Sequence, residues 1–569
     1  MRPTPARILP RAWAVVLPLL LLGPALGRGF VLTYDMVWVP DLALRADFLG
    51  LGTALPRAVP SDAVVAVLDE LVPGMLLQKL VLVGSLVLAG LGILRLVGRS
   101  ALAGCVAVSV YVWNPFVVER LAMGHWPVLL GYAVLPWLLV EGARYRRGAR
   151  LAPATLLLLP LGSLSASAAL LSSLALLVSG VSRRTPRRSA GLVALCAAAN
   201  APWVVAGLLH LSTATSTGAG SVFGLGDEGP LPGPLAALSL GGIWNAEVVP
   251  GSRHSLLLTV LATLVLLVAA LAGARPVLRR LGRRDTASLV TVWLVGYTLA
   301  LVTWLAPGAA GWVASHVPGG GLLRDGGRML ALCAPLTAVL VAAAAERLAD
   351  RWPDQGPRVL VGLAGALLPL ALMPDVAWGL GGRLEPADYP ADYARARDLV
   401  AASTAPGDVL LLPFTSYRAP VWNGGRKVLD PAGRYLTRDY LASDQLSVSG
   451  RVLAGEDPRV PEVLAALRAP DPEARSRRLA ALGVGLVVRE HDVPTTRDYD
   501  APVAGTTLLD GRDLEVVRLD EPVAPRTSSV ARDAATGAAW TAFLLLPVAG
   551  ILTVGWRRTR VVAGSRARR

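Results

Sequence analysis

Long apolar runs alternate with short polar stretches over most of the chain. A run of this length with few charges is typical of a membrane-spanning helix. Ten such runs lie at residues 12–26, 76–94, 101–113, 126–140, 190–211, 256–272, 287–306, 329–345, 359–373 and 538–556. Residues 151–181 are too long for one span and are interrupted by Pro160, Gly162 and several serines, so we expect a tight helical hairpin or re-entrant pair. With this pair counted as two crossings, the pattern predicts a polytopic α-helical membrane protein of about 12 spans.

The composition supports a membrane protein. Of 569 residues, 54% are hydrophobic and only 17% are charged, whereas about a quarter of the residues in an ordinary soluble domain are charged. A net charge of +15 would suggest a nucleic-acid partner in a soluble protein, but the basic residues fall between the apolar runs, so we expect membrane lipids and no nucleic acid as partners. Cys105, Cys196 and Cys333 lie in apolar segments without metal-ligand spacing, so neither a disulfide framework nor a metal site is expected.

The positions of the arginines predict the orientation in the membrane, because short cytoplasmic loops retain basic residues. Arginine clusters occur in alternate loops, near residues 2–11, 95–99, 144–150, 183–188, 275–284, 347–358 and 557–569. This alternation stays in phase when residues 151–181 cross twice. Both termini are then cytoplasmic in a multi-pass protein of the plasma membrane. The first apolar run also has features of a cleaved signal peptide, but we expect a retained helix.

One large segment has the composition of a soluble domain. Residues 376–535 contain strand-like runs at 408–413, 484–488 and 514–519, which alternate with helical stretches such as 393–402 and 475–482. We therefore predict three regions: a transmembrane domain at 1–375, an extracytoplasmic α/β domain at 376–535, and a final span with a basic cytoplasmic tail at 536–569. The α/β domain lacks GxSxG, GxGxxG and Walker motifs, so no independent catalytic site is expected in it.

Unusual polar residues occur in the predicted outside loops. Asp35 and Asp41 follow the first span, next to Tyr34 and Trp38, where a carboxylate could act as a general base at the membrane surface. Both acids could equally be solvated loop residues. Other acids of the same loop, including Asp62, are expected to be plain loop charges.

Two further loops carry candidate anion-binding side chains. Glu119, Arg120 and His125 lie between two spans, where the planar guanidinium of Arg120 suits a phosphate; the alternative is that these charges only solvate the loop. Arg324 and Arg328 lie in a glycine-rich stretch before a later span, on the side where arginines are rare. They could bind an anionic headgroup or phosphate, or form a simple salt bridge with Asp325.

The order of these features resembles a C-type glycosyltransferase (GT-C). An acid follows the first helix, Tyr-Val-Trp-Asn-Pro at residues 111–115 resembles the Tyr-x-x-(Asn/Ser)-Pro turn of the family, and the stretch ending at Arg328 resembles its Arg-(Asp/Asn)-x-x-Lys motif, with Arg in place of Lys. The likeness covers residues 12–375 and is to the amino-terminal membrane region of the actinobacterial α-(1→3)-arabinofuranosyltransferases. The long carbohydrate-binding carboxyl-terminal modules of those enzymes are not seen here. Because the family's catalytic acid directly follows the first helix, the resemblance also favours retention of that helix.

The resemblance implies a role for each candidate residue. Asp35 would be the general base, with Asp41 as the alternative, and Glu119, Arg120, His125, Arg324 and Arg328 would bind the substrate phosphate. The implied reaction is inverting, needs no metal or cofactor, and moves a sugar such as arabinofuranose from a polyprenyl-phosphate donor to a cell-envelope polysaccharide. Two alternatives stay open: a non-catalytic membrane scaffold and a transporter of lipid-linked saccharides.

Overall fold

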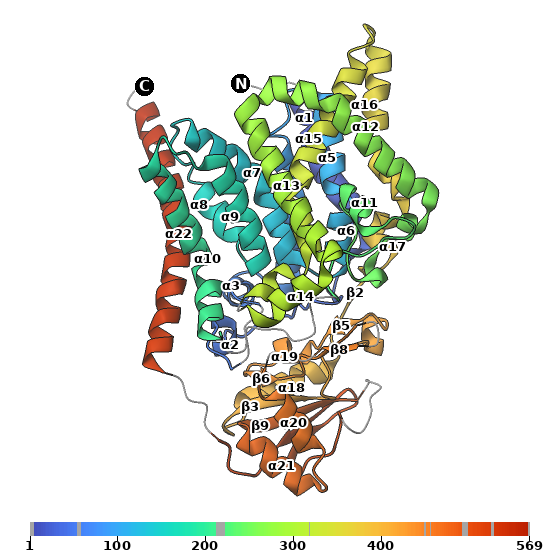
Figure 1. Ribbon diagram of the computed structural model, residues 1–569. Coiled ribbons are helices and arrows are strands. Elements are labelled where there is room, and N and C mark those ends of the chain that lie inside the picture. Colours follow the sequence, from blue (N-terminus) through green and yellow to red (C-terminus); the bar gives the residue numbers. More distant parts are fainter. Residues whose placement is uncertain are drawn as a thin grey trace.

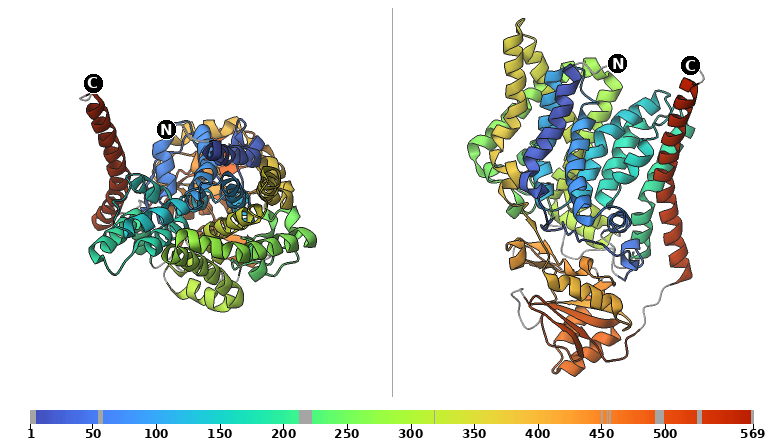
Figure 2. Two further views of the ribbon diagram at one scale, coloured as in Figure 1. Left: turned by 90° about the horizontal axis from the view of Figure 1, so that it is seen from above. Right: turned by 180° about the vertical axis from the view of Figure 1, so that it is seen from behind.

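The computed structural model describes residues 5–53, 58–211, 222–317, 319–448, 451–453, 455, 457–491, 499–524 and 529–566. A helical bundle occupies one end of the molecule and a smaller sheet domain the other, and the chain ends marked N and C lie at the end of the bundle away from the sheet domain (Figure 1). The last helix runs from the sheet-domain end along the side of the bundle, where it packs against α8 and α10 (Figure 2).

The bundle is built from long apolar helices. Within the described residues, nine helical segments are long and apolar enough to cross a membrane, and the bent pair of η5 (Gly326–Leu332) and α15 makes a tenth. The long helices are α1 (Pro5–Leu22), α4 (Gly74–Ile93), α5 (Ala101–Val112), which continues as α6 (Pro115–Ala122), α7 (Trp126–Arg146), α10 (Pro186–Leu209), α12 (Leu256–Leu281), α13 (Arg283–Leu305), α15 (Ala334–Ala349), α16 (Gln355–Leu372) and α22 (Val530–Arg566). The chain is therefore a multi-pass membrane protein.

The predicted hairpin is present, but it adds no full crossing. Its first arm, α8 (Thr155–Leu161), has seven residues and rises only about 10 Å, against a hydrocarbon core of about 30 Å. The second arm, α9 (Ala166–Gly180), runs parallel to α7, because Gly131 packs on Ala168 and Gly142 packs on Ser179. The prediction of about 12 spans counts this pair as two crossings, whereas neither arm is among the nine or ten segments of the described residues that are long and apolar enough to span.

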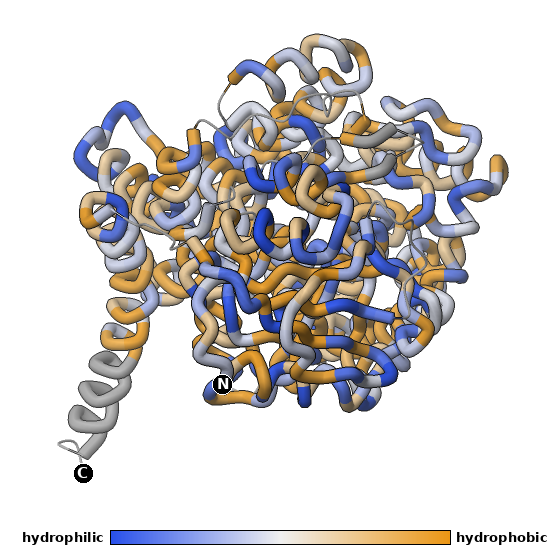
Figure 3. The backbone as a smooth tube through the Cα atoms, turned by 90° about the horizontal axis from the view of Figure 1, so that it is seen from below, coloured by the Kyte–Doolittle hydropathy of each residue, from blue (hydrophilic) through white to orange (hydrophobic). Residues whose placement is uncertain are grey.

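The arginine-rich connections meet at the end of the bundle opposite the sheet domain. Arg188 donates to the Gly148 carbonyl at 3.2 Å, and Arg280 donates to the Leu96 carbonyl at 3.2 Å. Figure 3 shows the molecule from the sheet-domain end. The sheet domain contains many hydrophilic segments, whereas much of the described part of α22 is hydrophobic. Arginines of different connections thus lie against neighbouring loops of the bundle.

The sheet domain contains a five-stranded mixed sheet in the order β10-β11-β9-β3-β6. Its strands are β3 (Asp408–Leu412), β6 (Tyr440–Leu441), β9 (Val484–Glu490), β10 (Thr506–Asp510) and β11 (Leu514–Arg518). Alternate side chains of β3 face opposite sides: Val409 and Leu411 join the core shared with α18 (Ala391–Ala402) and the bundle, whereas Leu410 and Leu412 pack with α20 (Val460–Leu467), next to α21 (Pro472–Ala481). The predicted strands and helices of this region are observed.

Shorter elements lie in the loops of the two parts and between them. They are β1 (Phe30–Val31), α2 (Ala46–Leu49), α3 (Ser61–Leu68), α11 (Gly233–Leu238), α14 (Pro307–His316), α17 (Ala377–Gly381), β2 (Pro386–Ala387), β4 (Tyr417–Arg418), β5 (Val428–Leu429), α19 (Ala432–Tyr435), β7 (Leu446–Val448) and β8 (Arg451–Leu453), with 3-10 turns η1 (Gly23–Leu26), η2 (Ala246–Val248), η3 (Gly251–His254), η4 (Gly320–Leu323), η6 (Pro374–Val376) and η7 (Val421–Asn423).

The loop after α1 is built into the sheet domain. Strand β1 pairs antiparallel with β2, and the side-chain amide of Asn423 donates to the Leu32 carbonyl at 3.1 Å. A single hydrophobic core also runs from the bundle into the sheet domain. The loop that carries Asp35 is therefore held by both parts of the molecule.

Candidate functional site

Backbone contacts from two directions fix the position of Asp35. Its amide donates to the Met123 carbonyl at 3.1 Å, on the bundle side. The preceding residue, Tyr34, donates to the Lys427 carbonyl at 2.7 Å and accepts from the Leu429 amide at 2.8 Å, on the sheet-domain side. Tyr34 has φ of +41°, in the left-handed region that a tyrosine rarely adopts. This costly conformation is maintained by the surrounding hydrogen bonds, as is common at functional sites.

Each carboxylate oxygen of Asp35 has a different partner. His125 Nε2 lies 3.0 Å from Oδ2, and the Tyr417 hydroxyl donates to Oδ1. The side chain stays 38% exposed, so it is accessible to a ligand. Burial by itself would raise the pKa of Asp35, but the hydrogen bonds from His125 and Tyr417, with the charge of Arg328, lower the pKa to about 2. The carboxylate is therefore ionised at all physiological pH values.

The contacts of His125 determine which ring nitrogen carries the proton. Arg120 Nη1 lies 3.3 Å from Nδ1, and a guanidinium can only donate. Nδ1 must therefore accept, and Nε2 carries the hydrogen that is donated to Asp35. Burial, followed by the nearby arginine charges, lowers the pKa of His125, which agrees with this neutral form.

Beyond His125, a chain of charged contacts continues through the bundle. Arg120, only 1% exposed, donates to both oxygens of Asp325 at 3.2 and 3.4 Å. Arg328 Nε lies 2.8 Å from the same carboxylate, and its Nη1 donates to the Ser167 hydroxyl at 3.2 Å. Arg328 is 31% exposed, whereas Arg120 is enclosed. Of these two arginines, Arg328 is thus the one that a ligand can reach.

Glu119 faces a second buried cluster and also interacts with Arg120. It is 2% exposed and lies close enough to Glu228 and Arg253 to interact with both. Arg253 donates two hydrogen bonds to Glu228, of 2.8 and 2.9 Å, and one to the Ser239 hydroxyl, of 2.7 Å. Two acids and one arginine thus lie together beside α6.

The other two predicted residues have distinct surroundings. Asp41, 56% exposed, forms an ion pair with Arg397 of α18 and so lies at the junction with the sheet domain. The guanidinium of Arg324 lies over the ring of Phe223, 4.7 Å from its centroid. The structure thus brings together Asp35, His125, Arg120 and Arg328, and places Glu119, Asp41 and Arg324 in other contacts.

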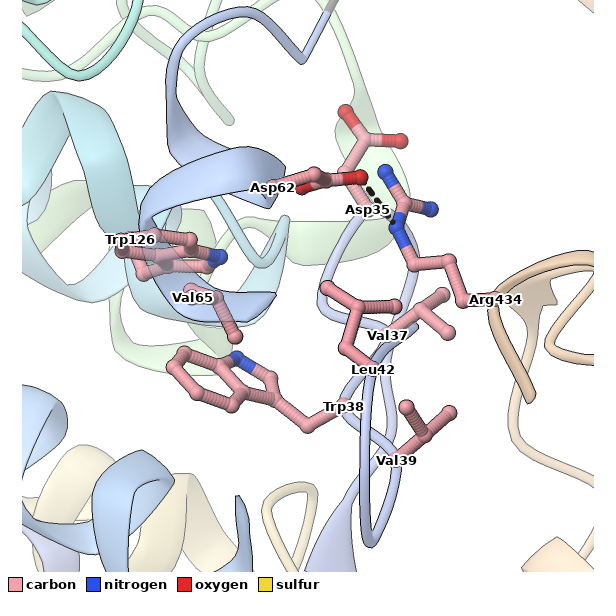
Figure 4. A pocket seen from close by; sticks show the side chains of 9 residues that line it. All are labelled: Asp35, Val37, Trp38, Val39, Leu42, Asp62, Val65, Trp126 and Arg434. Atoms are coloured by element: carbon pink, nitrogen blue, oxygen red, sulfur yellow. Dashed lines mark hydrogen bonds and ion pairs between the residues drawn. The ribbon is translucent and has the colours of Figure 1, made fainter. Parts of the chain in front are cut away.

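A small recess opens beside Asp35 (Figure 4). Its volume is about 20 Å³, and it is lined by Asp35, Val37, Trp38, Val39, Leu42, Asp62, Val65, Trp126 and Arg434. Arg434, from α19 of the sheet domain, forms an ion pair with Asp62 at 2.8 Å. The expectation that Asp62 is a plain loop charge is wrong, because Asp62 is buried in this pair.

An apolar groove of about 750 Å³ runs along α5, α12, α15 and α16. Ser239 and Arg253 line it towards the sheet-domain end, and Arg347 and Arg351 line it towards the opposite end. Between them the lining is mainly aliphatic, including Val106, Ala262, Ala269, Val341 and Leu368. The groove is thus shaped for a long hydrocarbon chain. Within the described residues, no group of three or more His, Cys, Asp or Glu side chains could hold a metal ion.

Sequence reasoning did not single out Tyr417, Asp62 or Arg434 as site residues. Tyr417 lies 382 positions from Asp35, and Arg434 lies 372 positions from Asp62. Asp325 was seen only as a salt-bridge partner of its neighbours. No local pattern connects such distant residues, so only the fold brings them together.

Known proteins give one line of comparison. No family model and no curated protein matches the sequence. The fold of the chain, a helical membrane bundle with a small sheet domain, occurs in a known protein. A solved structure that shares it is the arabinofuranosyltransferase AftD from Mycobacteria, with a TM-score of 0.53 and 17% sequence identity. The match covers 90% of this chain and 39% of the AftD chain. It confirms, at the level of the fold, the resemblance that the sequence motifs indicated.

Proposed function

We propose that the protein is a membrane glycosyltransferase that moves a sugar, arabinofuranose as the first candidate, from a polyprenyl-phosphate donor to a hydroxyl of a cell-envelope glycan. The observation that carries this proposal is the accessible carboxylate of Asp35, which is hydrogen-bonded at both oxygens. A chain of contacts through His125, Arg120 and Asp325 connects it to the partly exposed guanidinium of Arg328. A base and a phosphate-binding cation are thus combined in one site. The fold shared with AftD supports the same class.

The reaction is a single displacement. The acceptor hydroxyl oxygen forms a bond to the anomeric carbon as the bond from that carbon to the phosphate oxygen breaks, and the electron pair of the broken bond goes to the phosphate. The hydroxyl proton goes to Asp35. A carboxylate with a lowered pKa is a weak base, so the proton moves late, once the new bond has made the hydroxyl strongly acidic. Arg328, with Arg324 as the second predicted ligand, stabilises the charge of the leaving phosphate.

The arginine-rich loops support an orientation. Arginine-rich loops lie at the end opposite the sheet domain, and basic loops are typically cytoplasmic. The sheet domain and Asp35 are then extracytoplasmic, both termini are cytoplasmic, and the membrane is the plasma membrane. A polysaccharide acceptor outside the cell would have direct access to this face.

The apolar groove supports a lipid-linked donor, and a bulky substitution in it gives a prediction. Ala269 lines the groove and is 9% exposed, whereas Leu271 of the same helix is 81% exposed. We expect Ala269→Trp to raise the KM for a long-chain polyprenyl donor about tenfold, because the indole displaces hydrocarbon, and to have little effect on a farnesyl donor. Leu271→Trp is the matched control. Equal KM values for the two variants would remove the groove from the proposal.

Tyr417→Phe tests the support of Asp35 by the sheet domain. Loss of the hydroxyl removes a hydrogen bond that stabilises the carboxylate, so the pKa of Asp35 should rise towards its ordinary value. We expect kcat to fall about tenfold through lost orientation, and the acid limb of the kcat/KM profile to move to higher pH. Tyr499→Phe, on the other face of the sheet, should change neither quantity. An unchanged acid limb in Tyr417→Phe would contradict this role.

Transfer from a panel of donors tests the proposed function itself. Purified protein in lipid nanodiscs is given radiolabelled polyprenyl-phosphate, polyprenyl-diphosphate and nucleotide sugars, each with and without EDTA. We expect transfer from the polyprenyl-phosphate sugar alone, undiminished by EDTA. Movement of the donor across vesicle membranes without transfer would indicate the transporter, and glycan binding without either activity would indicate the scaffold.

A further inference from the structure

Two buried hydrogen-bond donors line the recess beside Asp35. Trp38 is 3% exposed and the Arg434 side chain is 13% exposed. Neither Trp38 Nε1 nor Arg434 Nη1 has a hydrogen-bond partner among the described residues. Buried donors without partners are rare in native proteins and call for an explanation. Because both residues line the same small recess as Asp35, a ligand that enters it would meet both kinds of hydrogen-bonding group.

Both donors are held firmly in place. The indole of Trp38 packs on Trp126, with ring centroids 5.2 Å apart. Arg434 is anchored by Asp62, whose carboxylate lies 2.8 Å from its Nε and leaves Nη1 for another partner. In Figure 4 the Arg434 guanidinium, Asp62 and Asp35 lie close together on one side, and the Trp38 nitrogen lies on the edge of its ring that faces Val65. The side chains that form the recess come from the bundle side and from the sheet domain.

The size of the recess restricts what it can hold. About 20 Å³ accommodates one group of the size of a water molecule and excludes a sugar ring. A hydroxyl fits the chemistry, since its oxygen accepts from N–H donors while its hydrogen is donated to a carboxylate. A cation is disfavoured by the Arg434 charge, and an anion by Asp35 and Asp62.

We propose that this recess receives a hydroxyl group of the acceptor sugar other than the attacking one, with Trp38 and Arg434 as hydrogen-bond donors and Asp35 as a hydrogen-bond acceptor. This assignment rests on the proposed transferase function. It makes the sheet domain a part of the acceptor site, because α19 supplies Arg434. It also explains why an enclosed pair, Asp62 and Arg434, is placed next to an exposed carboxylate.

Two substitutions test whether the recess binds this hydroxyl. Trp38→Phe removes the N–H donor and keeps an aromatic ring, and Arg434→Lys keeps the ion pair with Asp62 but removes the guanidinium fork. The full-length variants are assayed in nanodiscs with farnesyl-phosphoryl arabinofuranose and an octyl-linked arabinofuranose disaccharide. We expect the KM for the disaccharide to rise about tenfold in each variant, while the KM for the donor stays unchanged. Trp540→Phe, which also loses an indole hydrogen bond, to Leu49, is the matched control.

Singly deoxygenated disaccharides sharpen the test. One disaccharide of this set lacks the hydroxyl that binds in the recess. For that disaccharide, the KM of the wild type should be about tenfold higher than for the complete disaccharide. Trp38→Phe should not raise this KM further, because the indole N–H and the hydroxyl form one interaction. An unchanged KM for the disaccharide in both variants, with an active wild type, would contradict the binding of a hydroxyl in the recess. It would not affect the proposed transferase function. A variant effect confined to donor hydrolysis would assign the recess to water and overturn it as well. If Trp38→Phe fails to fold, Arg434→Lys decides. A wild type without transfer from any donor overturns both proposals.

Discussion

Replacement of Asp35 by Asn is expected to lower sugar transfer roughly 10³-fold, in the range that loss of a general base produces. The amide keeps the shape of the side chain and an oxygen that can accept from Tyr417. It cannot take up the proton of the attacking hydroxyl. Initial rates in nanodiscs, with saturating donor and acceptor, measure the effect, and thermal unfolding checks that the variant is folded.

Asp41→Asn is the matched control for this experiment. Asp41 lies in the same loop and is 56% exposed, but its carboxylate pairs with Arg397 at the domain junction. We expect this variant to keep most of the transfer activity. A large loss in Asp41→Asn together with full activity in Asp35→Asn would reassign the base to Asp41.

The second large effect is expected on stability. Arg120→Gln should lower the free energy of unfolding by about 3 kcal/mol, the lower end of the effect of breaking a buried ion pair, because the buried carboxylate of Asp325 keeps only Arg328 as a cation. Loss of the donor to His125 Nδ1 also frees the ring whose tautomer orients Asp35. Unfolding followed by tryptophan fluorescence in mixed micelles measures the change.

Two comparisons make this prediction specific. Arg358→Gln breaks a pair in which both side chains are at least 40% exposed, and should change stability by at most about 1 kcal/mol. Adding Asp325→Asn to Arg120→Gln should restore part of the loss, since the buried carboxylate that has lost one of its two cations is then neutral. Equal stability of Arg120→Gln and wild type would show that the buried chain does not hold the site together.

The membrane architecture could be predicted largely from the sequence, because apolar runs and arginine-rich loops are local signals. The hairpin of α8 and α9 was visible in Pro160 and Gly162, but the short length of α8 was not. Strand β3 could be predicted from an apolar run, since both of its faces are buried. These features depend on neighbours in the chain, which a single sequence contains.

The site could be predicted only in part. Asp35, His125 and Arg328 were identified through short motifs, and the structure connects them through Asp325 and Arg120. Motif position did not reveal that Glu119, adjacent to Arg120, also faces a second buried cluster. Tyr417 and Arg434 were missed because hydrogen bonds between the two parts of the protein leave no local pattern.

The sheet domain is more than an attachment to the bundle. Its strand β5 holds the backbone of Tyr34, and its β4 residue Tyr417 holds a carboxylate oxygen of Asp35. The side chain of the neighbouring Arg418 is fully buried and pairs with Glu490 at 3.1 Å and with Asp430, which makes this support rigid. Movement of the domain relative to the bundle would therefore change the geometry around Asp35.

The most direct test of sugar transfer at Asp35 is the product balance of one reaction. Wild-type protein in nanodiscs receives polyprenyl-phosphoryl arabinofuranose and a glycan acceptor, and released polyprenyl phosphate is counted against new glycosidic bonds. The proposed reaction predicts one bond for each lipid phosphate released, with inverted anomeric configuration, and neither product in Asp35→Asn. Release of lipid phosphate with free sugar and no glycosidic bond, or intact donor in the wild type, would contradict it.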